Sequence, residues 1–227
     1  MSTQTAGSLR QLPENHEFNF RCTSDTCDMR CCTTGHPLVL SPFEIQKISA
    51  FTGISFDRLE DDYFEESHDP KTGFPLYTIN RERGCRFLNG RICSVYSVRP
   101  LVCRLFPLGK LYDEGFTYVL LDENPCTGFE SATSNSNRRF RAEQAADSYD
   151  SMWEIWVNFI NEAEKIGMVD KSLFRSVFGM LVYNCDLPPP GISPEDAARM
   201  SAEALYRMRL AAAIEALPRL KSIFDKK

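Results

Sequence analysis

Cysteine is the residue type in this chain with the clearest capacity for chemistry. Nine cysteines occur among 227 residues, and eight of them fall between positions 22 and 126. These eight are Cys22, Cys27, Cys31, Cys32, Cys85, Cys93, Cys103 and Cys126. Thiolates are soft anionic ligands, and a fold that concentrates them commonly holds zinc or an iron–sulfur cluster. The set therefore predicts a metal centre built from cysteine thiolates.

A disulfide framework is the other common use of so many cysteines. Residues 1–17 are polar and contain no apolar stretch of the signal-peptide type, which predicts a cytoplasmic protein. Thiols stay reduced in the cytoplasm, and the odd total of nine fits complete pairing poorly. Metal binding is therefore favoured over disulfides and over unliganded redox thiols, and Cys185, outside the set, is expected to be a core residue.

The spacing of the first four cysteines suits metal binding. Gaps of two to four residues let the backbone curl around an ion, and the gaps from Cys22 to Cys32 lie in or near that range. Neighbouring side chains tend to diverge, so Cys31 and Cys32 more naturally serve two metals or two irons of one cluster. Eight thiolates suffice for two four-cysteine sites, or for one site with additional thiols. An iron–sulfur cluster ([4Fe–4S]) is slightly preferred, and structural zinc remains the alternative.

The charge pattern limits the partners. The formal net charge is −5, with acidic and basic residues mixed along the chain. No basic stripe is present, so nucleic-acid binding through phosphate neutralisation is not expected. No apolar run approaches the roughly 20 residues of a membrane span, so no membrane partner is expected. No glycine-rich phosphate loop is visible, and no catalytic residue can be assigned.

Short strands and helices are expected around the cysteines and longer helices after them, which predicts an α+β protein. Strands are expected at 18–22 and 74–80, and hairpins at 85–93 and 108–121, the first holding Cys85 and Cys93 side by side. Ser41 to Glu44 is a capping box that opens a helix to residue 51, and Ser55 caps an acidic helix over 56–66. Cys103 lies on a short turn or helix. Longer helices are expected at 138–166, with Trp153 and Trp156 on its core face, and at 171–184 and 193–224.

The change in character along the chain predicts four segments. They are a flexible tail over 1–17, a cysteine-cluster metal-binding module over 18–130, a polar linker over 131–137, and a helical region over 138–227 that packs on the module. The C-terminal helices offer a surface for a protein partner.

The cysteine pattern resembles a known family. The matching stretches are Cys22 to Cys32, Cys85-Arg86-Phe87-Leu88, and the run from Cys93 to Pro107. They are similar to the CxxCxxCC, or YkgJ, family of zinc- or iron-chelating domains, whose pattern is described as eight cysteines. The opening gaps here are four and three residues, where the family name has two and two. The resemblance covers residues 18–130 and implies that all eight cysteines bind metal.

The chain is also similar to the cysteine-rich part of flagellin lysine methylases, which is described as carrying an iron–sulfur cluster. Three functions are therefore open: an electron-transfer or redox protein, a structural zinc module for protein interaction, and a protein-modifying enzyme. Arg99 and Arg104 lie in the matching run. They either bind the cofactor region, by hydrogen bonds toward thiolates or by holding an anionic substrate, or form ordinary salt bridges.

Overall fold

The computed structural model describes residues 11–23, 27–33, 38–69, 73–82, 84–112, 115–121, 126–166, 177 and 179–224. These residues form helices and small antiparallel sheets joined by turns and loops, which confirms the predicted α+β class. The chain divides into two compact units. Unit 1 comprises residues 1–35 and 101–150, and unit 2 comprises residues 36–100 and 151–227.

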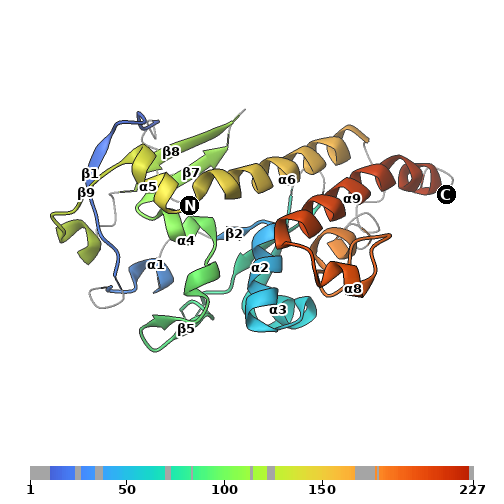
Figure 1. The fold of residues 1–227 in the computed structure, drawn as a ribbon, viewed down its shortest axis with the longest axis horizontal. Helices are drawn as coiled ribbons and strands as arrows, with labels where there is room; N and C mark the ends of the chain where they lie inside the picture. Colours follow the sequence, from blue (N-terminus) through green and yellow to red (C-terminus); the bar gives the residue numbers. More distant parts are fainter. Residues whose placement is uncertain are drawn as a thin grey trace, which may run out of the picture. The chain divides into compact units, whose positions relative to one another are not determined.

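Two short strands join distant parts of the sequence within unit 1. β1 (Glu17–Asn19) pairs antiparallel with β9 (Ser134–Ser136), with Phe18 opposite Asn135 (Figure 1). The polar linker expected at 131–137 therefore contains a strand. This polar segment is ordered because Asn135 and Asn137 are buried and their side-chain amides donate to backbone carbonyls rather than to water.

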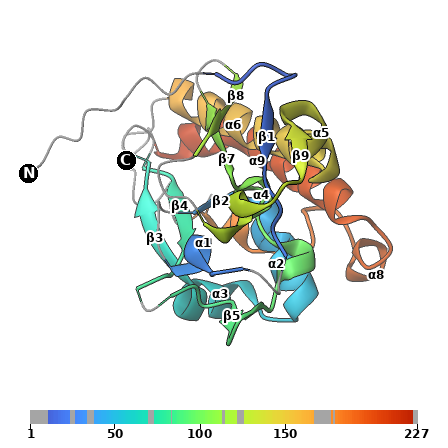
Figure 2. The same cartoon turned by 90° about the vertical axis from the view of Figure 1, so that its left-hand side faces the viewer.

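A hairpin in unit 1 has the predicted location. β7 (Leu108–Tyr112) and β8 (Phe116–Leu120) pair antiparallel, as expected for 108–121 (Figure 2). Lys110 Nζ lies 2.5 Å from one carboxylate oxygen of Asp150, and the Tyr118 hydroxyl donates to the other. Burial, together with this bond to a carboxylate, raises the pKa of Tyr118 above its usual range. These bonds tie the hairpin to Asp150, in the first turns of the helix that begins at Ala146.

The helix predicted over 138–166 is in fact two helices. α5 (Asn137–Glu143) begins after Ser136, whose hydroxyl caps it, and α6 spans Ala146–Ile166. Between them Ala145 adopts a left-handed conformation with φ 56°, which interrupts the helical hydrogen-bond ladder. No glycine or proline marks this break, so residue type alone gave no signal of it.

The first helix of unit 2 follows its capping signals. α2 (Pro42–Thr52) has the predicted capping box, in which the Ser41 hydroxyl accepts from Glu44 N–H and the Glu44 carboxylate accepts from Ser41 N–H at 2.8 Å. Gly53 ends the helix in the left-handed conformation, with φ 69°. Local sequence was sufficient here because both caps are made by residues adjacent to the helix.

A three-stranded antiparallel sheet lies next in unit 2. Its strands, in spatial order, are β2 (Val39–Leu40), β4 (Pro75–Ile79) and β3 (Phe64–His68) (Figure 2). The acidic helix expected over 56–66 is shorter, since α3 (Phe56–Tyr63) ends where β3 begins. Phe64 is buried and lies opposite Ile79, so pairing with the sheet overrides continuation of the helix.

α6 and the C-terminal helix contribute to the core of unit 2 together with α2, α3 and the three-stranded sheet. The part of α6 in this unit buries one stripe of side chains: Met152, Trp156, Phe159 and Ala163. Trp153, expected on the same face as Trp156, is only half-buried. The Tyr206 hydroxyl donates to the Met152 carbonyl at 3.2 Å, and the Tyr206 ring lies 5.4 Å from the Phe43 ring of α2.

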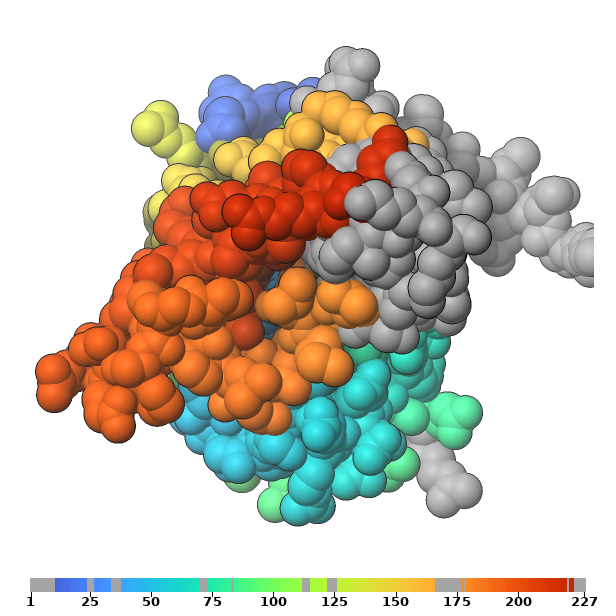
Figure 3. Space-filling model, turned by 90° about the vertical axis from the view of Figure 1, so that its right-hand side faces the viewer, coloured from blue at the N-terminus to red at the C-terminus, as the bar shows by residue number. Residues whose placement is uncertain are grey.

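The helix expected over 193–224 is also interrupted. α8 (Pro194–Ala197) and α9 (Ala202–Phe224) are separate, and the Ser201 hydroxyl caps α9 by accepting from Ala204 N–H. Figure 3 shows α9 in red on one face of unit 2, beside the orange segment that contains α8. Of the helix expected at 171–184, residues 179–183 are helical, whereas 171–176 and 178 lie outside the described residues. Among the described helices, none has the length and apolar character needed to cross a bilayer.

Candidate metal centre

The turn after Cys27 is shaped around a cysteine sulfur. The backbone N–H of Met29 donates to Cys27 Sγ at 3.3 Å. Met29 is left-handed, with φ 59°, and its carbonyl accepts the N–H of Cys32 at 2.9 Å as α1 (Arg30–Thr33) begins. An N–H aimed at sulfur stabilises the thiolate that binds metal. The turn therefore places a backbone donor against the sulfur at position 27.

Two backbone bonds bring the first and last cysteines of unit 1 to the same place. Phe20 N–H donates to the Thr133 carbonyl, and Arg21 N–H donates to the Gly128 carbonyl, each at 3.0 Å. Cys22 follows Arg21 directly, and Cys126 precedes the short helix η2 (Thr127–Glu130). Cys22 and Cys126 are thus held near each other although about one hundred residues separate them in sequence.

Four of the predicted ligands line one cavity in unit 1. Its lining contains Cys22, Cys27, Cys31 and Cys126, together with Phe20, Arg21, Thr23, Asp28, Phe106, Thr127 and Gly128. The cavity has a volume of about 20 Å³. Cys22 is exposed and the other three cysteines are half-buried, so the cavity communicates with solvent on one side. All nine cysteines lie among the described residues, and each is present as a thiol.

Aromatic rings form one wall of the cavity. Phe20 is 2% exposed, and its ring centroid lies 5.7 Å from that of Phe106 and 5.3 Å from that of Phe129. Gly128 packs directly on the Phe20 ring, where a Cβ would lie 2.5 Å from the nearest ring carbon. The wall keeps water from one side of the thiols, and low polarity strengthens electrostatic interactions there. Sequence reasoning did not select Phe20, Gly128 or Asp28, because only contact with the cysteines gives them a role.

The cavity concentrates negative charge when its thiols ionise. Burial raises the pKa of Cys126, and the Asp28 carboxylate and the thiolates of Cys31 and Cys27 raise it further, against a backbone hydrogen bond at Gly128 that lowers it. A bound cation lowers the pKa of coordinating thiols, so the same charges favour a metal. Among the described residues, no three cysteine, histidine, aspartate or glutamate side chains are grouped closely enough to hold one ion. The four cavity cysteines therefore match a thiolate-bound metal in chemical type, and binding one ion requires their side chains to move closer together.

The structure does not place all eight predicted ligands around this cavity. Cys32 and Cys103 belong to unit 1, the latter on α4 (Leu101–Leu105), but neither is among the lining residues. Only Cys31 of the adjacent pair reaches the cavity, as expected for diverging neighbours. Cys85 and Cys93 belong to unit 2.

The hairpin that carries Cys93 has a different register from the one predicted. β5 (Leu88–Asn89) pairs with β6 (Ile92–Cys93), so Leu88, not Cys85, lies opposite Cys93. Gly90 takes φ 61° as the first of the two turn residues, which moves the turn to Gly90 and Arg91. The predicted register, symmetric about the turn with Cys85 and Cys93 at the outer ends of the two arms, was therefore wrong.

The two arginines of the family motif each stack on an aromatic ring. The Arg99 guanidinium lies 3.9 Å from the Tyr96 ring centroid and donates to the Tyr96 carbonyl at 3.1 Å. The Arg104 guanidinium lies 5.5 Å from the Tyr149 ring centroid in unit 1. Neither arginine lines the cavity. A cofactor-binding role for them stays a prediction.

A small α+β unit with four thiols around one cavity is typical of cysteine-rich metal-chelating proteins. Residues 21–135 match the CxxCxxCC family, described as a "putative zinc- or iron-chelating domain". The match covers half of the chain, and the protein belongs to this family.

One relative is an uncharacterized protein of Methanocaldococcus jannaschii. It is 30% identical over 81 residues, which cover 33% of this chain and 29% of the relative. This chain thus aligns with less than a third of that protein's length. No solved structure matches the chain.

Proposed function

We propose that this protein binds an iron–sulfur cluster in unit 1, with Cys22, Cys27, Cys31 and Cys126 as ligands. The observation that carries the proposal is that three separate segments of sequence deliver these four thiols to one cavity. Four cysteines are the usual ligand set of [4Fe–4S] and [2Fe–2S] clusters. Such a cluster supplies one-electron chemistry when bound, which supports an electron-transfer or redox role in the cytoplasm.

Two features favour a cluster over a single ion. Only Cys31 of the adjacent pair lines the cavity, which leaves Cys32 for a further metal and suits a protein that holds more than one metal atom. The N–H bond to Cys27 and the phenyl wall are the kinds of contact that tune the potential of a cluster. Asp28 adds a carboxylate to the same cavity, which makes the donor set more anionic.

A structural zinc ion is the second candidate. The cavity volume of about 20 Å³ is close to that of one small occupant. Four thiolates at about 2.3 Å from one ion form a closed structural zinc site. In that case unit 1 depends on the metal for its fold, and the C-terminal helices of unit 2 are proposed as the surface for a protein partner.

The other four predicted ligands remain proposals that depend on the family pattern. Cys32, Cys85, Cys93 and Cys103 belong to the eight-cysteine pattern, and each is half-buried. A protein-modifying activity like that of the flagellin lysine methylases is likewise an alternative, in which the cluster supports catalysis.

Anaerobic purification with iron, zinc and acid-labile sulfide analysis of one sample tests the proposal. A cluster gives brown protein with about four irons and a matching amount of sulfide per chain. About one zinc without colour would replace the cluster by the zinc alternative. Cys126→Ser should lose most of the metal, whereas Cys185→Ser, in unit 2, should retain it. Equal metal content in both variants would refute the ligand set.

A further inference from the structure

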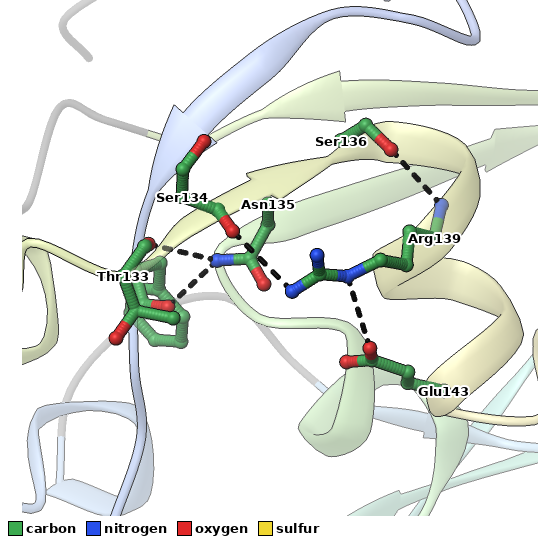
Figure 4. A network of polar contacts seen from close by, with 7 residues as sticks. Thr133, Ser134, Asn135, Ser136, Arg139 and Glu143 are labelled. Atoms are coloured by element: carbon green, nitrogen blue, oxygen red, sulfur yellow. Dashed lines mark hydrogen bonds and ion pairs between the residues drawn. The ribbon is translucent and has the colours of Figure 1, made fainter.

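The buried side chain of Asn135 donates hydrogen bonds to the backbone just before Cys22, the first cysteine. Asn135 is 5% exposed, and its Nδ2 donates to the Phe20 carbonyl at 2.7 Å and to the Thr133 carbonyl at 3.2 Å. Figure 4 shows the Asn135 amide nitrogen directed at Thr133, while the neighbouring Arg139 donates to the Ser134 carbonyl and to the Glu143 carboxylate.

The peptide units of Phe20 are thereby fixed on both sides. Its N–H donates to the Thr133 carbonyl, and its carbonyl accepts from Asn135. The next residue, Arg21, donates its N–H to the Gly128 carbonyl in the segment that carries Cys126. The chain direction at Cys22 is therefore set before the cysteine itself is reached.

We infer that Asn135 is a positioning residue of the metal centre, acting through the Phe20 carbonyl on Cys22. The inference rests on the proposed function. Asn135 does not line the cavity, so it acts without touching the metal. Its amide holds Cys22 near Cys126 before metal arrives, and this preorganisation lowers the entropy lost when the thiolates bind. Loss of the amide should weaken metal binding and loosen the ligand geometry.

The chain offers a matched control two residues away. Asn137 is 1% exposed, and its Nδ2 donates to the carbonyls of Pro13 at 3.1 Å and Leu12 at 3.3 Å. Both asparagines are buried in unit 1, and each bridges two carbonyls. Asn137, however, fixes a segment before β1 that contains no predicted ligand. Substitutions at the two positions should have similar structural effects but different effects on the metal.

The test is a cobalt(II) titration of the metal-free full-length chain under anaerobic conditions. Thiolate-to-cobalt charge-transfer bands count the bound thiolates, and the ligand-field bands report their geometry. Asn135→Leu and the smaller Asn135→Ala should each raise the Kd for cobalt by about tenfold and change the ligand-field bands. Asn137→Leu and Asn137→Ala should stay within about twofold of wild type, with unchanged bands.

The outcomes separate this inference from the proposed function. If wild type shows cysteine-to-cobalt bands but the Asn135 variants match it, the positioning role is wrong and the metal centre stands. Equal losses in the Asn135 and Asn137 variants would also overturn the positioning role, since they indicate a general loss of structure. If wild type shows no thiolate bands, the metal centre fails and the inference fails with it. Circular dichroism of each variant identifies any that do not fold. If a Leu variant does not fold, the Ala variant at the same position decides the outcome.

Discussion

Gly128→Ala places a methyl group between the backbone at residue 128 and the buried ring of Phe20, neither of which can easily move. The added Cβ would lie 2.5 Å from Phe20 Cε2, with Cζ at 3.0 Å and Cδ2 at 3.1 Å. Ordinary contact begins near 3.4 Å, so the ring edge or the backbone must retreat by about 0.9 Å, the difference between these two distances.

The surroundings of Phe20 determine the size of the effect. Its ring is 2% exposed and packs edge-on against Phe106, Phe129 and Phe140. Overpacking of a filled site costs about 1–3 kcal/mol. We expect the upper part of that range, because the Gly128 carbonyl also accepts Arg21 N–H and limits backbone movement. Metal affinity should fall as well, since both residues line the cavity.

Urea unfolding of wild type and variant measures the change in unfolding free energy. Gly115→Ala in the same unit is the control, because no described residue has an atom within 4 Å of the added Cβ, and it should change stability by less than about 0.5 kcal/mol. Adding Phe20→Leu to Gly128→Ala should cost less than the sum of the two single effects, since a smaller side chain leaves room for the methyl. A Gly128→Ala protein as stable as the Gly115→Ala protein would refute the packing argument.

Two further predictions concern the left-handed Met29 and the half-buried thiol of Cys185. Met29→Gly should stabilise the protein by up to about 1 kcal/mol in urea unfolding, because φ 59° is unfavourable for a residue with a Cβ, whereas Met29→Ala should give no such gain. Burial raises the pKa of the Cys185 thiol despite a hydrogen bond with Ser49. The contribution of Cys185 to the free energy of unfolding is therefore constant below the ordinary thiol pKa of about 8.5. It is lost as the pH rises from there through the higher pKa of the folded state. The stability difference between wild type and Cys185→Ala should shrink above about pH 8.5, and a constant difference would contradict the assignment.

Signals confined to neighbouring residues were sufficient to predict several elements. The capping box of Ser41 and Glu44, the left-handed Gly53 and the hairpin at 108–121 all involve residues close in sequence. Each element is specified by its own turn or cap, so no distant contact is needed to place it.

Elements that depend on distant contacts were beyond sequence reasoning. Phe64 continues an acidic helical pattern but joins a sheet, because Ile79 lies opposite it. Ala145 breaks a helix without any breaking residue type. The hairpin at Asn89 and Gly90 was recognised, but its register depended on which turn position the glycine takes.

The candidate site divides in the same way. Cysteine content predicted metal-binding chemistry, and of the adjacent pair only Cys31 lines the cavity. The grouping with Cys126 could not be predicted, since it depends on bonds from Phe20 and Arg21 to residues more than one hundred positions later. Asn135 looked like part of a linker because its burial is a property of the fold alone.

The discontinuity of unit 1 sets an order of events during synthesis. Residues 1–35 emerge from the ribosome well before residues 101–150, which complete the unit. At roughly 5–20 residues per second, Cys126 follows Cys31 by about 5–20 s. Throughout that interval the first three thiols of the cavity exist on a nascent chain without the fourth. A complete ligand set, and with it a tightly held metal, becomes available only after Cys126 has been made.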